Sequence, residues 1–440
     1  MICVGSIGCA PFDDPIGIGP PGGVLGRPDG PAATLATLAS GTVAVFATAD
    51  GSAALLAELP RDGAVEKRTP TVLSDDSSWR RHPPVALPTQ EGQLLVAWRE
   101  TRPGEPGRMM WIETDASASS LPNPEPLPAA FGSRPEIGGT PPSLTAVEGD
   151  PGGPRAGRVR ELGVWQRAPA AEGGWIRLGT PLKGLPRLYA ATGLGPEIAL
   201  TALVDDTGAL RFVRSGIDGG RTSMVVRGRP SGPRPVWLAA AGEAVVAGWS
   251  ETVGGRGGYS AVRTSRSSDG GVTWDKPLDL GRSRFLEPQL ASFASRGSTI
   301  VVAWNASDGV IDRIFLAVSH DGGASFSPRR AVDGGTPARE RRRVRVALAG
   351  DRALIAWQER GRNEPAAVYA SFFESLDAEP TIRAERLAEA APGHAVRNPQ
   401  PWLSTEGGGV LWESLPAPES PQAPATAAPP VLLRARTLRR

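Results

Sequence analysis

The chain has 440 residues, 40% of them hydrophobic, with 55 glycines and 44 prolines, and its formal net charge is only +2. So many glycines and prolines disfavour a helical protein, while the hydrophobic fraction is high enough to exclude a disordered chain. Because the 48 basic and 46 acidic residues are interspersed, no strongly positive field marks a nucleic-acid partner, and we expect none.

The N-terminal segment 1–28 is predicted to lie outside the main domain. It holds the only two cysteines, Cys3 and Cys9, so no disulfide or Cys/His metal cluster is expected elsewhere in the chain. Ser6-Ile7-Gly8-Cys9 resembles the end of a bacterial lipoprotein signal, which implies lipidation of Cys9 and a tether over residues 10–28. Only eight residues precede Cys9 and none is basic, so either the signal begins further upstream or the match is a coincidence. No later stretch approaches the roughly 20 apolar residues of a membrane-spanning helix.

After this segment, short apolar runs that end in an aromatic residue recur at a regular interval. The runs are Val43–Phe46, Leu95–Trp98, Leu162–Trp165, Val246–Trp249, Val302–Trp304, Ile355–Trp357 and Val410–Trp412, with Glu197–Val204 as a copy that lacks the tryptophan. The last four tryptophans are 53 to 55 residues apart. We interpret the eight runs as equivalent strands of a repeating unit that is longer than a WD40 repeat and close to a kelch-sized blade.

Each run follows a short strand that opens near a proline and precedes one or two further strands, which gives four strands per unit. Consecutive four-stranded units that pack face to face are typical of a β-propeller. We therefore predict an all-β chain whose residues 29–440 form one propeller domain of four-stranded antiparallel blades, eight by repeat count. Seven blades would result if the first unit merged with the C-terminal strands, and six is a further alternative.

The recurring tryptophans are predicted to fill the core between blades. Three other tryptophans lie outside the repeated position and are the better candidates for a sugar-stacking surface. They are Trp79, Trp111 and Trp175.

Two turns share a more specific pattern. Ser267–Trp274 reads Ser-Ser-Asp-Gly-Gly-Val-Thr-Trp and Ser319–Phe326 reads Ser-His-Asp-Gly-Gly-Ala-Ser-Phe. In such a turn the aspartate accepts backbone N–H groups, the glycines take positive φ, and the last aromatic packs on the blade. These octapeptides resemble the Asp-box, or BNR repeat, of the sialidase-like propeller superfamily, and a weaker copy surrounds Asp218. The resemblance implies a structural role on the outer part of the blade for Asp218, Asp269, Trp274, Asp321 and Phe326.

Resemblance to sialidases raises the question of catalysis. Sialidases bind the substrate carboxylate with three arginines and use an aspartate acid/base and a glutamate-activated tyrosine nucleophile. Gly26-Arg27-Pro28, followed by Gly41–Phe46, resembles the first arginine motif of that family but lacks its aromatic residue and isoleucine. Tyr259 and Tyr369 fall in predicted third strands, away from the channel. We therefore expect no catalysis; if sialidase-type hydrolysis does occur, the candidate catalytic residues are Glu136, Glu287 and Tyr189.

Arginines recur at or just before the predicted first strands. They are Arg27, Arg81, Arg134, Arg187, Arg234, Arg284, Arg343 and Arg397. In a propeller these positions converge on one mouth of the central channel, where several guanidinium groups can hold an acidic glycan or carboxylate. The alternative is that they bond the loops of adjacent blades together. The arginine-rich runs 339–345 and 434–440 are interpreted as a solvated strand edge and a tail.

We therefore predict an exported, extracytoplasmic, monomeric propeller that binds an acidic glycan or protein at an arginine-lined channel mouth, with no metal or other cofactor. The alternatives are an exo-α-sialidase-type hydrolase and a structural propeller of a cell-surface assembly.

Overall fold

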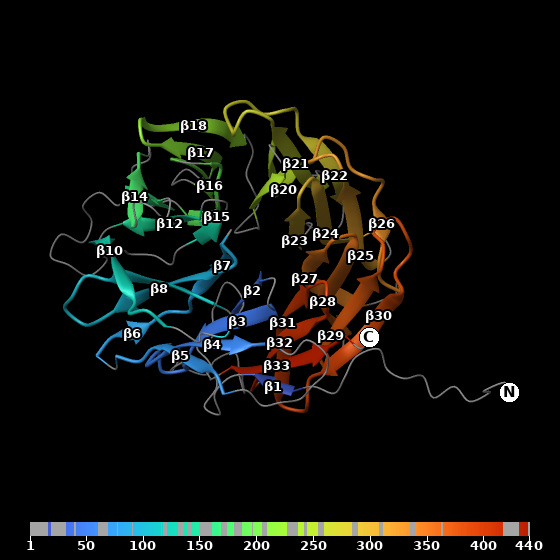
Figure 1. Cartoon of the computed structure of the whole chain (residues 1–440). Helices are drawn as coiled ribbons and strands as arrows, with labels where there is room; N and C mark the ends of the chain where they lie inside the picture. The colour runs from blue at the N-terminus through green and yellow to red at the C-terminus, as the bar shows by residue number, and fades with distance from the viewer. Residues whose placement is uncertain are drawn as a thin grey trace.

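The computed structural model describes residues 16–18, 32–38, 41–59, 69–76, 78–89, 91–115, 117, 121–130, 136–138, 142–148, 161–168, 174–179, 187–195, 197–204, 209–226, 236–241, 244–253, 259–283, 289–307, 311–334, 339–361, 364–416 and 431–438. The regular elements in these residues are β-strands, grouped into eight antiparallel sheets around a common axis (Figure 1). None of the described segments forms a helix with the length and hydropathy needed to span a membrane. The predicted eight-bladed β-propeller is confirmed, and the seven- and six-bladed alternatives were wrong.

The first four blades follow one another along the chain. Blade 1 contains β2 (Thr34–Leu38), β3 (Gly41–Ala47), β4 (Ala54–Glu58) and β5 (Thr71–Ser74). Blade 2 contains β6 (Arg80–Arg81) and β7 (Val85–Pro88), which both pair with β8 (Leu94–Thr101), and then β9 (Arg108–Thr114) and β10 (Glu125–Ala130). Blade 3 contains β11 (Glu136–Gly138), β12 (Ser143–Glu148), β13 (Glu161–Arg167) and β14 (Trp175–Leu178). Blade 4 contains β15 (Arg187–Gly193), β16 (Ile198–Val204), β17 (Leu210–Gly216) and β18 (Gly219–Val226).

The last four blades complete the ring. Blade 5 contains β19 (Trp237–Ala241), β20 (Ala244–Val253), β21 (Tyr259–Ser267) and β22 (Leu278–Ser283). Blade 6 contains β23 (Gln289–Arg296), β24 (Thr299–Ser307), β25 (Asp312–Ser319) and β26 (Arg330–Ala331). Blade 7 contains β27 (Arg339–Ala349), β28 (Arg352–Gly361), β29 (Ala367–Phe373) and β30 (Ile382–Glu389). Blade 8 contains β31 (His394–Leu403), β32 (Gly408–Pro416), β33 (Leu432–Thr437) and β1 (Ile16–Ile18).

The first strand of each blade lies nearest to the axis. Contacts between neighbouring first strands run from β2 through β7, β11, β15, β19, β23, β27 and β31 back to β2. The pairing register shifts within β15, β23, β27 and β31, which marks a bulge where these inner strands begin. In blades 7 and 8 the bulges hold Arg343 and Asn398 at φ of 56° and 51°. Because a bulge re-aims nearby side chains, these residues turn away from the regular pleat.

The recurring aromatic residues fill the core between adjacent blades, as the sequence predicts. Phe46, Trp98, Trp304 and Trp357 are completely buried on second strands, and their neighbours in the core come from two blades. Alternate apolar residues on these strands face the two adjacent blades, which is why almost the whole run is hydrophobic. We estimate that truncating one of these side chains to alanine removes about 3–5 kcal/mol of stability.

One glycine makes room for this packing. A Cβ atom on Gly248 would lie 2.0 Å from the ring of Trp237, its partner on the adjacent strand β19. The glycine before Trp249 therefore lets the indole of Trp237 lie flat across β20.

The structure corrects two predictions about elements. Leu162–Trp165 belongs to the third strand β13, whereas the second strand of blade 3 is β12, which has no tryptophan. The interval between Trp165 and Trp249 is long because the second strand of blade 4, β16, has no tryptophan, and it is shorter than two full repeats because Trp165 lies on a third strand. Arg339–Arg345 is no solvated edge, because it begins the innermost strand β27 and Arg341 is 1% exposed.

The N-terminal segment also differs from its predicted role as a tether. Within residues 1–28, β1 pairs with β33 and supplies the fourth, outermost strand of blade 8. Figure 1 shows this blue strand beside the red C-terminal strands. The chain therefore closes its ring by combining an N-terminal strand with three C-terminal strands.

Candidate functional site

The predicted channel mouth lies at the end of the blades where each inner strand begins. The connection from a fourth strand to the next first strand reaches this end, as does the loop between the second and third strands. The described part of the chain places Arg81, Arg341, Arg343, Arg345 and Arg397 in inner strands there. They fall into two groups that differ in their partners.

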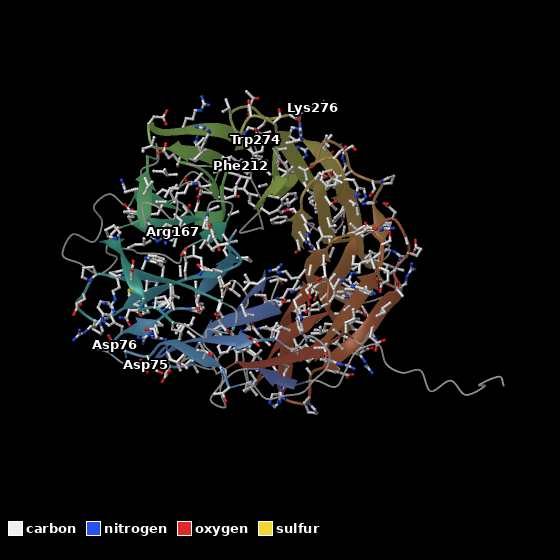
Figure 2. All side chains as sticks on the ribbon, viewed as in Figure 1. Asp75, Asp76, Arg167, Phe212, Trp274 and Lys276 are labelled. Carbon is white, nitrogen blue, oxygen red and sulfur yellow. The ribbon has the colours of Figure 1, made fainter. Side chains whose placement is uncertain are left out.

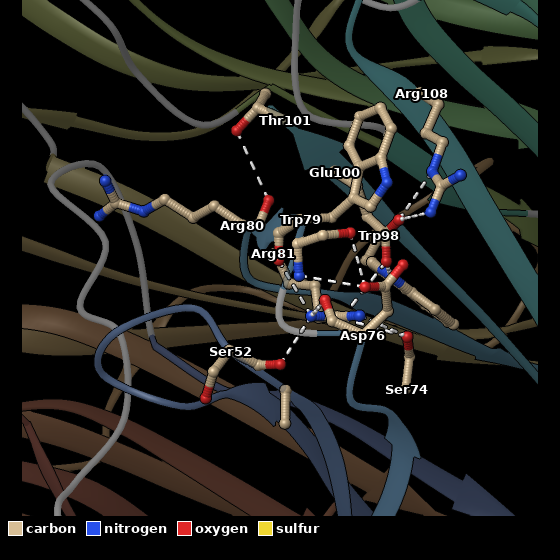
Figure 3. Close-up of polar contacts among 12 residues, drawn as sticks. Ser52, Ser74, Asp76, Trp79, Arg80, Arg81, Trp98, Glu100, Thr101 and Arg108 are labelled. Atoms are coloured by element: carbon tan, nitrogen blue, oxygen red, sulfur yellow. Dashed lines mark hydrogen bonds and ion pairs between the residues drawn. The ribbon is translucent and has the colours of Figure 1, made fainter. Parts of the chain in front are cut away.

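Arg81 is completely buried and joins blade 2 to blade 1 (Figure 3). Its Nη1 donates to the carbonyl groups of Ser52, Asp76 and Trp79 at 2.6, 2.8 and 3.0 Å. Its Nε and Nη2 donate to Ser74 Oγ, and Nε lies 3.3 Å from Glu100 Oε1. The guanidinium thus finds hydrogen-bond acceptors and a counter-charge inside the protein, which offsets the cost of removing it from water.

Glu100 is the centre of the same cluster. It lies directly opposite Arg81 in the strand pair, accepts from the indole N–H of Trp98 at 2.8 Å, and pairs with Arg108 at 2.7 Å. The Arg108 guanidinium also lies 4.0 Å above the ring of Trp79. Trp79 is 8% exposed and serves this cluster rather than an open sugar-stacking surface.

Arg341 repeats this arrangement between blades 6 and 7. It lies opposite Glu359 and its Nε is 3.2 Å from Glu359 Oε2 and 2.7 Å from Asp333 Oδ2. It also donates to the carbonyl group of Asp312 in blade 6. Trp357 donates to Glu359 at 3.2 Å, as Trp98 does to Glu100. The alternative in which an arginine bonds adjacent blades together therefore describes Arg81, and Arg341, which is outside the predicted set, makes the same kind of contact.

The sequence contains a signal for these clusters that the repeat search missed. In blades 2, 5 and 7 a glutamate follows the core tryptophan by two residues, and the indole N–H donates to its carboxylate. Blade 3 reaches the same result from another strand, because Trp165 donates to Glu148 of β12 at 2.8 Å. The spacing Trp-x-Glu was visible in the sequence, but only the fold reveals which arginine meets each glutamate.

Arg397 and Arg343 connect blade 8 to its neighbours. Arg397 donates to Glu413 Oε2 at 2.8 Å, and the other carboxylate oxygen accepts from the backbone N–H of Ala32 at 2.6 Å. Arg343 donates to Asn398 Oδ1 at 2.5 Å, so the bulged residues of blades 7 and 8 contact each other. Burial and the nearby Arg397 guanidinium lower the pKa of Arg343.

Arg345 differs from these residues because no described carboxylate pairs with it. Its half-buried side chain has one hydrogen bond within the described residues, to the carbonyl group of the adjacent Val344 at 3.2 Å. Burial, together with the Arg343 guanidinium, lowers the pKa of Arg345. Both arginines nevertheless stay charged at neutral pH. They form a pair of like charges on the inner strand β27.

The structure describes the other predicted site residues only in part. Arg187 and Tyr189 lie on the inner strand β15 and Glu136 on the inner strand β11, but their side chains are outside the described part. Arg27, Arg134, Arg234, Arg284, Glu287 and Cys9 lie outside the described residues altogether.

The remaining tyrosines lie on third strands, as predicted, away from the axis. Tyr259 is on β21 and Tyr369 on β29. The Tyr369 ring stacks on Trp357 with 6.0 Å between ring centroids, and its hydroxyl accepts from Arg339 at 3.3 Å.

Trp111 and Trp175 also contribute to packing between blades. Their rings meet edge to face at 5.8 Å, and the Arg167 guanidinium lies 4.7 Å above Trp111. Trp111 is buried and Trp175 half-buried. Neither forms a flat exposed platform.

The two Asp-Gly-Gly turns lie at the opposite end of the blades, between third and fourth strands. Asp269 Oδ1 accepts the backbone N–H groups of Val272 and Thr273 at 3.0 and 2.8 Å, and the Thr273 hydroxyl donates to Oδ2 at 2.5 Å. Asp321 accepts the N–H and hydroxyl of Ser325 in the same way. The hydroxyls of Thr273 and Ser325, followed by the backbone N–H groups, lower the pKa of each aspartate to about 2.

The aromatic residue that ends each turn packs inward. The ring centroids of Trp274 and Phe212, a residue of the preceding blade, are 5.5 Å apart, and Figure 2 labels the two residues next to each other. Phe326 packs on the core between blades 5 and 6. Asp218 lies in a different turn, since Ile217 and Asp218 form the two-residue loop of the β17–β18 hairpin.

No family model and no curated protein matches this sequence. Among solved structures, a protein of unknown function from Dyadobacter fermentans is 14% identical, with 82% of this chain and 96% of that chain covered and a TM-score of 0.42. The NanB sialidase from Streptococcus pneumoniae is 10% identical over 82% of this chain and 69% of its own, with a TM-score of 0.38. The β-propeller domain of the Trilobed protease from Pyrococcus furiosus is 10% identical over 73% of this chain and 88% of its own, also with a TM-score of 0.38.

Proposed function

We propose that this protein binds an acidic ligand at the mouth of its central channel, with Arg345 and Arg343 holding the negative charge. The observation that carries the proposal is the half-buried Arg345, which has a like charge beside it and no described carboxylate partner. Burial without a counter-ion disfavours a guanidinium, and a bound anion would relieve that cost. A carboxylate suits the planar donors of arginine, which can form two parallel hydrogen bonds with it.

This site is smaller than the one expected from the sequence. Arg81, Arg341 and Arg397 already have a carboxylate within their blades, so they support the ring rather than a ligand. The proposed contacts therefore come from two arginines of β27, beside the bulge of blade 8. The ligand is a glycan or a protein side chain that bears a carboxylate.

Two matching Asp-Gly-Gly turns in blades 5 and 6 support a place for this chain among sialidase-like Asp-box propellers. In line with that resemblance, we propose an exported, monomeric protein with Cys9 as a lipid attachment point. Binding is favoured over sialidase-type turnover, because two of the three tyrosines, Tyr259 and Tyr369, lie on third strands, which leaves Tyr189 on β15 as the one remaining candidate nucleophile.

Calorimetric titration of the full chain with sialyllactose and oligogalacturonate tests the proposal. Neutral lactose serves as the matched ligand control. We expect Arg345→Gln to weaken binding of the acidic sugars about tenfold or more, because a hydrogen bond to a charged group is lost. Arg342→Gln is the matched variant, because Arg342 is exposed in the same run and pairs with Glu340. Equal affinity of the two variants for the acidic sugars would contradict the proposal. Hydrolysis of a fluorogenic sialoside by the wild-type protein would instead support the alternative function, a sialidase-type hydrolase.

A further inference from the structure

A cavity of about 530 Å³ lies among the inner strands of blades 2 to 6. Figure 1 shows three of these strands, β7, β15 and β23, around the centre of the ring. Among the described residues that line the cavity, the side chains are aliphatic or aromatic except for two hydroxyls, and none is charged. The volume is typical of small-molecule sites, which have mostly apolar linings with a few polar groups.

The cavity lies toward the ends of the inner strands. Its lining includes Pro88 and Gly138, the last residues of β7 and β11. Ser298, in the hairpin after β23, accepts the backbone N–H of Gly322 at 2.9 Å, so this end of the ring is the one with the Asp-Gly-Gly turns. Ala240 of β19 lines the cavity and is exposed, which makes the cavity accessible from solvent. No residue of the fully described strand β27 lines it, so the cavity is distinct from the proposed arginine site.

Small residues at one register position create part of the space. Ala240 in blade 5 and Ser295 in blade 6 both pair with the residue four positions before the core tryptophan of their blade. Leucine occupies the same position in blades 7 and 8, as Leu348 and Leu403. The cavity therefore lies on the side of the ring where this leucine is absent.

A glycine shapes another part of the wall. A Cβ on Gly138 would lie 2.2 Å from the carbonyl oxygen of Ala191, and both residues line the cavity. Glycine therefore allows β11 and β15 to approach each other closely at this point. The wall between blades 3 and 4 is thus set by the backbone rather than by movable side chains.

An aromatic side chain forms a further part of the wall. Phe293 of β23 stacks on Trp237 of β19, with 4.6 Å between the ring centroids and 21° between the ring planes. Trp237 is buried and Phe293 is half-buried, so the indole supports a phenyl ring that lines the cavity. A supported ring of this kind can stack with a flat ligand at little cost in side-chain entropy.

The polar groups of the lining are neutral. Thr192 is 3% exposed and its hydroxyl donates to the carbonyl group of Gly193 at 3.3 Å, whereas Ser295 is half-buried. Ser295 is two residues from Phe293 on β23, so its hydroxyl lies on the same face of the strand as the phenyl ring. The inner strands also pair with a neighbour on one side only, so their other edges offer backbone N–H and C=O groups toward the axis.

We propose that this cavity binds an uncharged aromatic molecule, with its ring against Phe293 and a neutral polar group, such as an amide, near Ser295. A charged ligand is disfavoured, because no charged side chain of the described lining would compensate for its loss of water. A sugar is disfavoured as well, because most of its hydroxyl groups would face apolar side chains. This site is additional to the proposed acidic-ligand site and does not depend on it.

Equilibrium dialysis of the full chain against benzamide, 2-naphthamide and 2-naphthoate tests the inference. We expect 2-naphthamide to bind about tenfold more tightly than benzamide, because its second ring buries more apolar surface. 2-Naphthoate has nearly the same shape as 2-naphthamide but carries a negative charge. We therefore expect the cavity to bind 2-naphthoate at least tenfold more weakly, since an anion would lose its water without gaining a counter-charge.

A double variant with Ala240→Leu and Ser295→Leu fills part of the cavity. It places leucine at the register position where blades 7 and 8 already hold it, so we expect the variant to fold. It should weaken binding of 2-naphthamide at least tenfold. Ala391→Leu, at an exposed position between β30 and β31, is the matched control and should bind 2-naphthamide like the wild type.

Two single variants complete the test. Phe293→Leu keeps an apolar side chain but removes the ring, so we expect it to weaken binding of 2-naphthamide by about two- to tenfold. Arg345→Gln should leave the affinity for 2-naphthamide unchanged, because no residue of β27 lines the cavity.

Three results would overturn the inference. The first is absence of 2-naphthamide binding to the wild type, whatever the variants do. The second is a double variant that binds 2-naphthamide as tightly as the wild type, because the compound would then bind elsewhere. The third is equal affinity of the wild type for 2-naphthamide and 2-naphthoate with an equal loss of both in the double variant, because the cavity would then not select uncharged ligands.

Discussion

Arg81 and Glu100 are almost completely buried, yet both carry charge. Arg81 bonds to five groups from two blades, and Glu100 accepts from an indole and two guanidinium groups. Such a cluster adds little net stability relative to apolar residues, but removing one member leaves the rest without a counter-charge. Its effect is therefore to fix how blade 2 sits on blade 1.

We predict that Glu100→Gln lowers the stability of the protein by about 3 kcal/mol, because Arg81 keeps its charge and loses its carboxylate. Urea unfolding followed by tryptophan fluorescence measures the change, and Trp98 reports on the cluster directly. Glu91→Gln is the matched control at an exposed loop position of the same blade, where the expected change is within about 0.5 kcal/mol. Equal midpoints for the two variants would show that the buried carboxylate does not stabilise the contact.

His82 provides a second prediction at this scale. Burial, followed by the charges of Arg99 and Arg80, lowers its pKa from 6.5 to about 4. Between these two pH values the unfolded chain is protonated at His82 while the folded chain is not. The free energy of unfolding is therefore highest above pH 6.5 and decreases as the pH falls toward 4. We expect His82→Gln to flatten this part of the stability profile, measured by urea midpoints from pH 7 to pH 4.5. The exposed His394→Gln should retain the wild-type slope.

At the scale of single elements, the turns were the most predictable feature. Ser267–Trp274 and Ser319–Phe326 adopt the same conformation, and their glycines take φ between 67° and 82°. The groups that hydrogen-bond to Asp269 and Asp321 lie within four residues of each aspartate. Local chemistry therefore decides the conformation, and the sequence alone was sufficient to predict it.

Asp321→Ala tests the contribution of one such turn. We expect a loss of about 1 kcal/mol at neutral pH, since the hydrogen bonds to an exposed carboxylate are partly replaced by water. The folded pKa of Asp321 is about 2, below that of an unfolded aspartate, so the difference from wild type is present above pH 4 and disappears as the pH falls toward 2. Unfolding midpoints at pH 7, 4 and 2.5 measure it. Asp218→Ala, in the exposed hairpin loop, is the control. A similar loss of stability in that variant would show that the effect is not specific to the hydrogen bonds of the Asp-Gly-Gly turn.

Strand identity was harder to predict than turn geometry. Leu162–Trp165 has the apolar run and the tryptophan of a second strand, yet it forms the third strand of blade 3. Its tryptophan packs between blades and meets Glu148, just as tryptophans on second strands meet their own glutamates. The pattern reports burial between blades, which both the second and the third strand experience, so it cannot specify the order of strands.

Arg341 and Arg345 show a further limit of the sequence. They are four residues apart in one run, yet one is buried against two carboxylates and the other is half-buried without a described carboxylate partner. The difference depends on Asp333 and Glu359 and on the bulge at Arg343. These are long-range features, so the sequence predicted arginines at the channel mouth but not which of them a ligand could use.

For the whole molecule, the decisive feature is how the ring closes. Blade 8 takes three strands from the C-terminal end and β1 from the N-terminal end, and β1 pairs with β33 through Ile16, Gly17 and Ile18. Glu413 adds a second link, because it accepts from Ala32 on the way into blade 1. Such a short strand gave no signal in the sequence, since its three residues lie in a Pro- and Gly-rich segment.

We predict that ring closure depends on β1. A chain that starts at residue 20 lacks β1 and leaves β33 as an exposed edge, whereas a chain that starts at residue 13 keeps the strand. We expect the shorter chain to unfold at a lower urea concentration and to associate at high concentration through the open edge, because unpaired strand edges recruit other strands. Urea titration and light scattering of the two chains measure both effects. A peptide of residues 10–22 added in trans should restore the urea midpoint of the shorter chain. If the two chains have the same urea midpoint without the peptide, the prediction is wrong. In that case contacts such as that of Glu413 with Ala32 hold the ring closed, and the N-terminal strand is dispensable.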